Sequence, residues 1–309
     1  MIEIDDVELL DYQSKNNLTI IPIKTPTNYK LDFLTLKKGF ELGLVEVKEL
    51  ENSTVNTLIV KNKSVTPLLL IEGEEIIGGD QNRIVNSTIV IAGESEMKIP
   101  VNCTEQGRWG YKHEFKDSDY IANSRTRFAK SSARSHNMDE QAAVWNSVKV
   151  LESQKNYYSP TQAMSENYDN AKTDLKETIE GFEIVKGQTG VLIIINGEVK
   201  GFEVFFNPEI YRQFHEKILK SYLIDSTEKK EVYTVDTEYA KSIISAAIEC
   251  EYAQKDSVGL EECFEFANDD GIGSLYAYKE EVVHWTYLIG KTDFNAEEWS
   301  EHDGVSVTL

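Results

Sequence analysis

The chain has 309 residues, of which 40% are hydrophobic and 10% aromatic, enough for a substantial core in one large domain or two smaller ones. Its formal net charge of −21 argues against broad electrostatic binding to nucleic acid or to anionic membranes, because both need a basic surface. This composition favours a soluble, cytoplasmic protein that can still carry a local basic pocket for a small anion.

The spacing of cysteines and histidines argues against disulfide-bonded and histidine-metal sites. The three cysteines, Cys103, Cys250 and Cys263, are widely spaced, which fits a reducing compartment better than a disulfide framework. The five histidines show no HExxH or HxH spacing, so no metal ligands are assigned. The N-terminus lacks a signal-peptide pattern, and no apolar run approaches the roughly 20 residues that span a bilayer.

The first hundred residues are predicted to form short β-strands. Their apolar or alternating runs are residues 18–23, 42–47, 57–60, 68–71, 74–77, 87–92 and 97–101. Glu72-Gly73 is predicted to turn the strand 68–71 back into 74–77 as a hairpin, and Gly78-Gly79 frees the backbone from ordinary φ limits.

Residues 111–134 are rich in Ser, Arg, Lys and Asp, which predicts a long and mobile connection. The segment is either a solvated linker or a lid over an anionic ligand. The lid interpretation rests on its positive residues, which are Arg125, Arg127, Lys130 and Arg134.

Helices are predicted next, from 138 to 152 with Asn137 as the cap and from Thr161 to Ile179. Residues 191–206 are predicted to form a hairpin around Asn196-Gly197. Two more helices follow, one over 208–222 capped by Asn207 and one capped by Asp236. The chain then returns to strands at 263–267, 274–278 and 282–288.

These elements predict an α+β fold, with mainly antiparallel sheet in two halves and a helical middle section. The whole chain, 1–309, is predicted to form one unit with sub-parts 1–110, 111–180 and 181–309. Residues 69–74 (LLIEGE) resemble 193–198 (IIINGE), which indicates either an internal duplication or two unrelated hairpins.

Four carboxylates gather in the stretch from Pro67 to Trp109. They are Glu72, Glu74, Glu75 and Glu105. Two carboxylates in different environments can divide acid and base work, and carboxylates can also ligate Mg²⁺. The alternative is that they are ordinary strand and turn glutamates in a chain with 53 acidic residues.

Two polar motifs suit recognition of a sugar phosphate or nucleotide. Gln81-Asn82-Arg83 offers amides and a planar guanidinium, and Glu105-Gln106-Gly107-Arg108-Trp109 adds a charged pair and an aromatic ring that can stack. The alternatives are a hydrogen-bonded loop and a packed tryptophan. Cys103 is expected to be a buried thiol, and His284 is the candidate general base from the far end of the chain.

At these residues the chain resembles the ADP-ribosylglycohydrolase and rhodanese-phosphatase associated protein domain family. The resemblance is clear over residues 67–109 and weaker through 190–206 and 282–284. The family positions present here are Gly73, Gln81, Asn82, Arg83, Glu105, Gly107, Arg108 and Trp109. The resemblance implies a role near ADP-ribose or NAD-derived nucleotides in bacterial conflict or antiviral systems.

The resulting hypothesis is a protein that binds, and if it is an enzyme hydrolyses, an ADP-ribose-like or other phosphorylated nucleoside. Glu105, Glu74 and His284 are the catalytic candidates. The candidate ligand-binding residues are Glu72, Gln81, Asn82, Arg83, Gln106, Arg108 and Trp109. The alternatives are a non-catalytic ligand-sensing or scaffold module with a protein partner, and a purely structural role in which the motif charges pair with one another.

Overall fold

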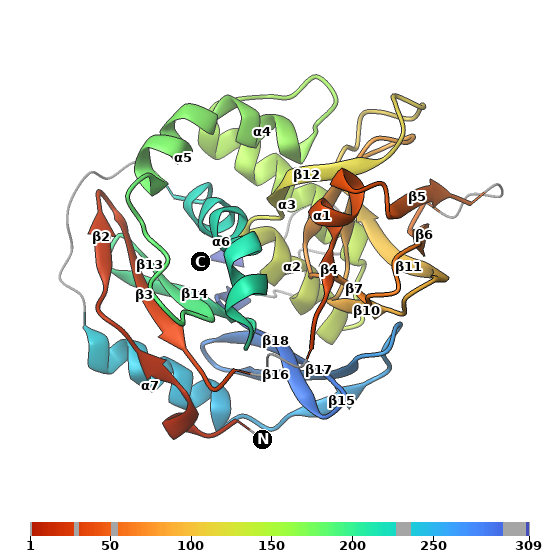
Figure 1. Cartoon of the computed structure of the whole chain (residues 1–309). Helices are drawn as coiled ribbons and strands as arrows, with labels where there is room; N and C mark the ends of the chain where they lie inside the picture. Colours follow the sequence, from red (N-terminus) through yellow and green to blue (C-terminus); the bar gives the residue numbers. More distant parts are fainter. Residues whose placement is uncertain (1, 28–30, 51–54, 227–235, 293–306, 309) are drawn as a thin grey trace.

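The computed structural model describes residues 2–27, 31–50, 55–226, 236–292 and 307–308. The sheets are mainly antiparallel, with one parallel pair between β4 and β7, and helices pack between and around them, which confirms the predicted α+β class (Figure 1). Helix α6 contacts β12 of one sheet and β13 and β14 of another, so the helices join the two β regions. None of the described helices combines the length and apolar character that crossing a bilayer requires.

The largest sheet combines the two ends of the chain. Its order is β1–β3–β13–β14–β18–β17–β16–β15, with β2 also paired to β3, and every pairing is antiparallel. The strands are β1 (Glu8–Leu9), β2 (Gln13–Lys15), β3 (Leu18–Lys24), β13 (Gly190–Ile195), β14 (Glu198–Val204), β15 (Ala253–Lys255), β16 (Glu262–Asn268), β17 (Gly271–Tyr278) and β18 (Glu281–Ile289). The early strand β3 thus belongs to the sheet of the late strands.

The strands between residues 34 and 121 form two smaller sheets. The six-stranded one has the antiparallel order β12–β8–β9–β11–β6–β5, and the three-stranded one has the order β10–β7–β4. Their strands are β4 (Leu34–Thr35), β5 (Val45–Glu49), β6 (Thr57–Asn62), β7 (Leu68–Leu70), β8 (Glu74–Ile77), β9 (Arg83–Val85), β10 (Ile89–Ile91), β11 (Ser95–Cys103) and β12 (Lys116–Ile121). A separate pair joins β19 (Lys291–Thr292) to β20 (Val307–Thr308).

Two sequence-similar segments fold differently. Asn196-Gly197 closes the predicted hairpin between β13 and β14. The predicted turn at Gly73 also forms, with a positive φ of 83°. However, β7 pairs with β10 and β4, whereas β8 pairs with β9 and β12. The hairpin predicted for residues 68–77 is therefore wrong, because the turn passes the chain from one sheet to another.

Some of the helices begin at the capping residues predicted for them, and others do not. They are η1 (Ile4–Asp6), α1 (Leu36–Glu41), α2 (Ser124–Ser135), α3 (Glu140–Lys155), α4 (Met164–Asn170), α5 (Lys172–Ile179), α6 (Pro208–Leu223) and α7 (Thr237–Ile248). Asn207 and Asp236 cap α6 and α7 as predicted. Asp139 rather than Asn137 caps α3, and the single helix predicted to end at Ile179 is divided into α4 and α5.

The prediction of a mobile connection over residues 111–134 is wrong. The segment contains strand β12 and most of helix α2, and its Arg127 and Lys130 side chains are buried. Both cations meet buried carboxylates, which offset the cost of removing their charge from water. Polar composition was misleading here because it could not show which charges are paired inside the molecule.

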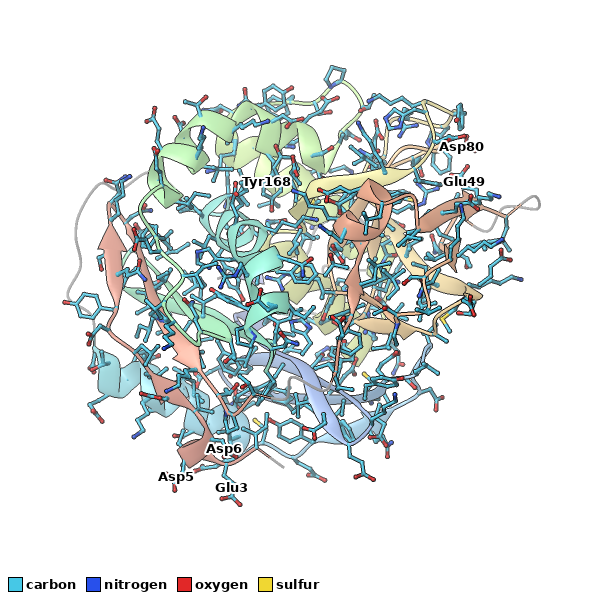
Figure 2. The ribbon with its side chains drawn as sticks, viewed as in Figure 1. Glu3, Asp5, Asp6, Glu49, Asp80 and Tyr168 are labelled. Carbon is cyan, nitrogen blue, oxygen red and sulfur yellow. The ribbon has the colours of Figure 1, made fainter. Side chains whose placement is uncertain are left out.

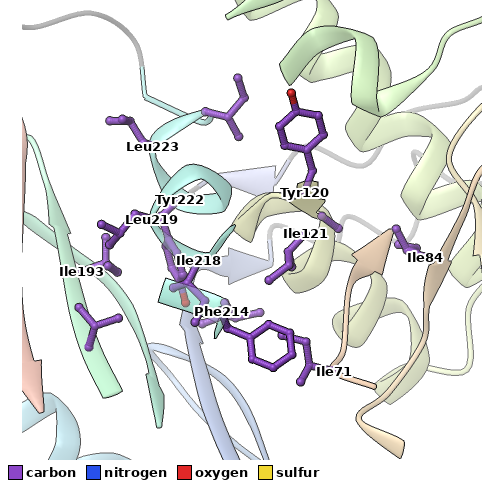
Figure 3. Packing of buried hydrophobic residues seen from close by; sticks show 14 of the residues in the cluster. Ile71, Ile84, Tyr120, Ile121, Ile193, Phe214, Ile218, Leu219, Tyr222 and Leu223 are labelled. Atoms are coloured by element: carbon purple, nitrogen blue, oxygen red, sulfur yellow. The ribbon is translucent and has the colours of Figure 1, made fainter. Parts of the chain in front are cut away.

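The largest hydrophobic cluster lies between the β regions. Figure 3 shows Ile71, Ile84 and Ile121 on one side of α6 and Ile193 on the other, with Phe214 and Ile218 of the helix among them. These contacts bury apolar surface from all three sub-parts of the chain in one core. The polar groups described below are embedded around this core and in the adjacent loops.

Candidate functional site

The glycines of the Gly78–Arg83 loop permit its tight path. Gly78 and Gly79 both have positive φ angles, of 127° and 52°. A Cβ atom at Gly79 would lie only 2.3 Å from the Phe115 ring, so a side chain there would displace packed atoms. The two glycines therefore let the backbone approach the segment that follows Trp109.

The Arg108 guanidinium connects neighbouring loops. Its Nη2 lies 2.6 Å from Glu105 Oε2, and its Nη1 donates to the carbonyl oxygens of Gly79 at 2.6 Å and Gly110 at 2.8 Å. Burial raises the pKa of Glu105, but hydrogen bonds from Arg108 and Thr161 outweigh it and lower that pKa. Arg108 is thus engaged in holding the loops together.

Asn82 fixes the same loop from within. Its Oδ1 accepts the Gly78 N–H at 3.1 Å and an Arg108 N–H at 3.2 Å, and its Nδ2 donates to Ser165 Oγ at 3.2 Å. Both polar ends of this amide are therefore used. The side chain joins the loop to helix α4, which lies more than eighty residues further along the chain.

Arg83 and Gln81 are also turned inward. Arg83 donates to the Val55 carbonyl at 3.0 Å and lies 3.4 Å from Glu49, with 1% of its surface exposed. Gln81 Nε2 donates to the Glu105 carbonyl at 2.9 Å, and its Oε1 is buried without a partner in the described part of the chain. The motif amides and arginines therefore bind mainly to neighbouring protein atoms.

The tip of the loop after Arg108 presents aromatic side chains to solvent. Trp109 is 64% exposed and Tyr111 is 67% exposed. Figure 2 shows Asp80 and Glu49 near the outer rim of the molecule, and the Asp80 N–H donates to Glu49 at 3.0 Å. Gln106 Oε1, by contrast, is buried without a partner among the described residues. Trp109 is therefore the large side chain of the motif that faces solvent, with Tyr111 close behind it in the sequence.

Glu72 belongs to a different, deeper network. Its Oε1 lies 2.7 Å from Lys130 Nζ and accepts the Ser131 hydroxyl at 3.0 Å. Burial raises the pKa of Glu72, but Lys130 and then Arg134 more than offset it, so the pKa is lowered. Because Lys130 also donates to the Asn86 carbonyl, the pair fastens helix α2 to the loops around β8 and β9.

A chain of hydrogen bonds joins the first half of the sequence to the late strands β14 and β18. Thr88 Oγ1 lies 2.8 Å from His284 Nδ1, and His284 Nε2 lies 2.9 Å from Glu203 Oε2. Glu203 also pairs with Arg127 and accepts the Tyr222 hydroxyl at 3.2 Å. Although burial opposes it, Arg127 followed by His284 lowers the pKa of Glu203 to about 2. We call this set the buried relay: Thr88, His284, Glu203 and Arg127.

Glu74 and Glu75 occupy separate environments on strand β8. Glu74 lies 3.4 Å from Lys217, which also pairs with Asp117 at 2.8 Å. Burial raises the pKa of Glu74 to about 7 despite the opposing charge of Lys217. Glu75 accepts hydrogen bonds from the Thr104 and Ser118 hydroxyls at 2.9–3.0 Å, and burial raises its pKa to about 7 as well.

The structure does not bring the three catalytic candidates into one network. Glu105 pairs with Arg108, Glu74 with Lys217, and His284 with Glu203. Each candidate has at most 1% of its surface exposed. In the part of the chain that the structure describes, no three carboxylate, imidazole or thiol groups gather to hold a metal ion.

Two surface hollows lie away from the motif. The first has a volume of 290 Å³ and is lined by Lys176, Ile179, Glu180, Gly181, Phe182, His215, Glu216 and Leu219. The second has a volume of 500 Å³ and is lined by Phe33, Lys37, Lys38, Glu41 and Gln213. None of the predicted site residues lines either one.

The partners of the catalytic candidates were not predicted from the sequence. Thr88 and Glu203 contact His284, and Lys217 contacts Glu74. One signal was present, because Glu203 is a charged residue that stands between the apolar residues Phe202 and Val204. A charge at such a position predicts a buried partner.

We expect Arg108→Ala to lower the free energy of unfolding by about 2 kcal/mol, because Glu105 loses its cation and several carbonyls lose their donor. Chemical denaturation monitored by tryptophan fluorescence and by circular dichroism measures the change. Lys112→Ala, at an exposed position in the following segment, is the control and should change stability by less than about 0.5 kcal/mol. Equal effects of the two substitutions would contradict the role assigned to Arg108.

A comparison with known protein families identifies the family of the chain. The ARG and Rhodanese-Phosphatase-superfamily-associated Protein domain, ARPP-1, matches residues 6–288. The chain belongs to the ARPP-1 family. The match extends from η1 to β18 and so takes in the ARPP-1 motif loops and the buried relay alike. Comparison with curated proteins and with solved structures gave no match for this ARPP-1 chain.

Proposed function

We propose that this ARPP-1 chain is a non-catalytic binding module that recognises a protein partner through Trp109 and Tyr111. The observation that supports this proposal is that the charged residues of the motif bind to neighbouring loops, whereas Trp109 at the end of the motif and Tyr111 just after it are more than 60% exposed. Tryptophan and tyrosine supply a large share of the binding energy at protein interfaces. The Arg108 contacts hold these rings on an ordered loop, which reduces the entropy lost on binding.

The description of the family supports a partner of a particular kind. It names association with ARG and with the rhodanese-phosphatase superfamily, and the second of these is the one we take up. We therefore propose a member of that superfamily, encoded in the same genome, as the protein that contacts the aromatic loop. The formal charge of −21 favours a partner surface with basic residues around an apolar pocket.

Binding of an ADP-ribose-like or other phosphorylated nucleoside is the second candidate function. The exposed Trp109 ring favours it, because an indole can stack on a base. Phosphate binding would require Arg83 or Arg108 to exchange protein contacts for the ligand. Hydrolysis would further require access to Glu105, Glu74 or His284, which are buried.

We expect Trp109→Ala to weaken binding of the rhodanese-phosphatase partner by about 30-fold, because loss of a central aromatic residue costs about 2 kcal/mol at an interface. Biolayer interferometry with purified proteins measures the affinity. Trp109→Ala should leave the unfolding midpoint unchanged, since the ring is mostly exposed.

Tyr239→Ala provides the matched control, because Tyr239 is 52% exposed on the separate helix α7. It should bind the partner as the wild type does. No affinity of the wild type for such a partner, together with a thermal shift by NAD or ADP-ribose that Trp109→Ala removes, would replace the first proposal with the second.

A further inference from the structure

Strand β15 ends the nine-stranded sheet with one side open. It pairs with β16 on one side, and no described residue pairs with its other side. All three of its residues are exposed, and the exposed run continues to Val258. Figure 1 shows β15 at the lower rim of the molecule. Such an edge presents backbone N–H and C=O groups that can pair with a further strand.

The opposite end of the same sheet is anchored to a neighbouring segment of the chain. There, Gln13 of β2 exchanges hydrogen bonds with the backbone of Glu183, and Lys15 donates to the carbonyl oxygens of Glu177 and Glu180. Within the described ranges, no hydrogen bond of this kind reaches residues 253–255. The edge at β15 is therefore the more accessible of the two.

Two opposite charges flank Ala253 on one face of this edge. Successive residues of a strand alternate between faces, so Glu251, Ala253 and Lys255 share a face. The Tyr252 ring lies 4.5 Å from the Phe266 ring of β16, between centroids, so the chain already follows β16 just before β15 begins. Glu251 and Lys255 are both exposed, and neither forms an ion pair with a described residue.

These charges complement themselves under one two-fold rotation. When a second copy lies antiparallel along β15 with the two Ala253 residues opposite each other, Glu251 lies opposite Lys255 of the partner subunit, and the reverse pair forms as well. A register centred on Gln254 forms neither ion pair, and one centred on Lys255 places two lysines opposite each other. Opposite charges stabilise cross-strand pairs and like charges destabilise them, so the charges favour the register centred on Ala253.

The loop that follows β15 adds apolar surface next to this edge. Val258 is 38% exposed and Leu260 is 45% exposed. The buried Glu261 carboxylate accepts the N–H groups of Val258 at 3.2 Å and Val90 at 2.7 Å, and the Leu260 N–H donates to the Val90 carbonyl at 2.9 Å. Because these bonds order the loop, little entropy is lost when a second molecule covers it.

We infer that β15 is the contact surface of a homodimer, in which the nine-stranded sheets of two copies join edge to edge. The occupant is a second copy of this chain, because the charges of the edge complement themselves. The contact does not involve the aromatic loop, so it is independent of the proposed partner binding. One short strand and a loop bury less than a standard interface, and we expect a dissociation constant on the order of 10 μM.

Sedimentation velocity of the full chain, without any other protein, tests the dimer. The concentrations run from about 1 to about 200 μM in about 0.15 M salt, where screening beyond about 8 Å limits the repulsion between two chains of charge −21. We expect the weight-average sedimentation coefficient to rise with concentration from the monomer value toward the dimer value. A monomer at every concentration would overturn the inference, and Lys255 would then be a charge that blocks edge pairing.

Charge reversal identifies the strand and its register. Lys255→Glu and Glu251→Lys each place like charges opposite each other and should weaken self-association about tenfold. An equimolar mixture of the two variants should regain the dimer, because every facing pair is again opposite in charge. Lys98→Glu, at an exposed position of β11 in the six-stranded sheet, is the matched control and should associate as the wild type does. Unchanged association of Lys255→Glu, or a mixture that stays monomeric, would overturn the assigned contact.

Discussion

Arg127→Met should lower the free energy of unfolding by about 3–5 kcal/mol, because it leaves the carboxylate of Glu203 buried without its cation. The effect is large since Glu203 lies at the centre of the buried relay and cannot reach water. Equilibrium denaturation at neutral pH measures it. The loss should appear together in the tryptophan and secondary-structure signals, because the relay joins both halves of the chain.

The double variant Arg127→Met with Glu203→Gln separates a lost charge partner from a lost packing contact. We expect it to recover a large part of the stability, since no unpaired charge remains. Lys24→Met breaks the exposed Lys24–Glu8 pair and should cost less than about 1 kcal/mol. If Arg127→Met were as mild as Lys24→Met, the buried relay could not be a major contributor to stability.

Glu75→Gln should make the protein less sensitive to rising pH. The folded pKa of Glu75 is raised from 4.5 to about 7, so the folded chain holds the proton more tightly than the unfolded chain. The stability that this proton contributes is complete below pH 4.5 and is lost as the pH rises through 7. Between pH 5 and pH 8 the wild type should therefore lose about 2–3 kcal/mol more than Glu75→Gln.

Denaturation curves at half-unit steps from pH 5 to pH 8 test this expectation. Glutamine keeps the size of the side chain, and the hydroxyls of Thr104 and Ser118 can rotate to suit an amide. Glu114→Gln, at an exposed position, should run parallel to the wild type throughout. A parallel curve for Glu75→Gln would show that its carboxyl is not the titrating group.

Local sequence signals predicted much of the fold. Capping by Asn207 and Asp236 and the Asn196-Gly197 turn depend on a few adjacent residues, and these predictions are confirmed. The class of fold also followed from periodicity. By contrast, Gly73 joins strands of two different sheets, and pairing between distant strands leaves no mark in the residues next to a turn.

Local sequence signals predicted only part of the candidate site. The sequence placed Glu105 next to Arg108, and the structure shows the pair. It could not show that Arg83 and Asn82 face inward, because burial depends on segments far away in sequence such as Ser165. Residues 111–134 failed for the same reason, since the carboxylate that pairs with Arg127 lies on β14.

The position of β3 has a consequence for how the chain acquires its structure. This strand is apolar and fully buried except at Lys24, yet its neighbour β13 begins only at Gly190. During synthesis, β3 is therefore an aggregation-prone apolar segment that cannot pair with β13 until most of the polypeptide has been made. We expect ARPP-1 folding to be slow, and we expect it to require that β3 is protected from self-association until β13 has been synthesised.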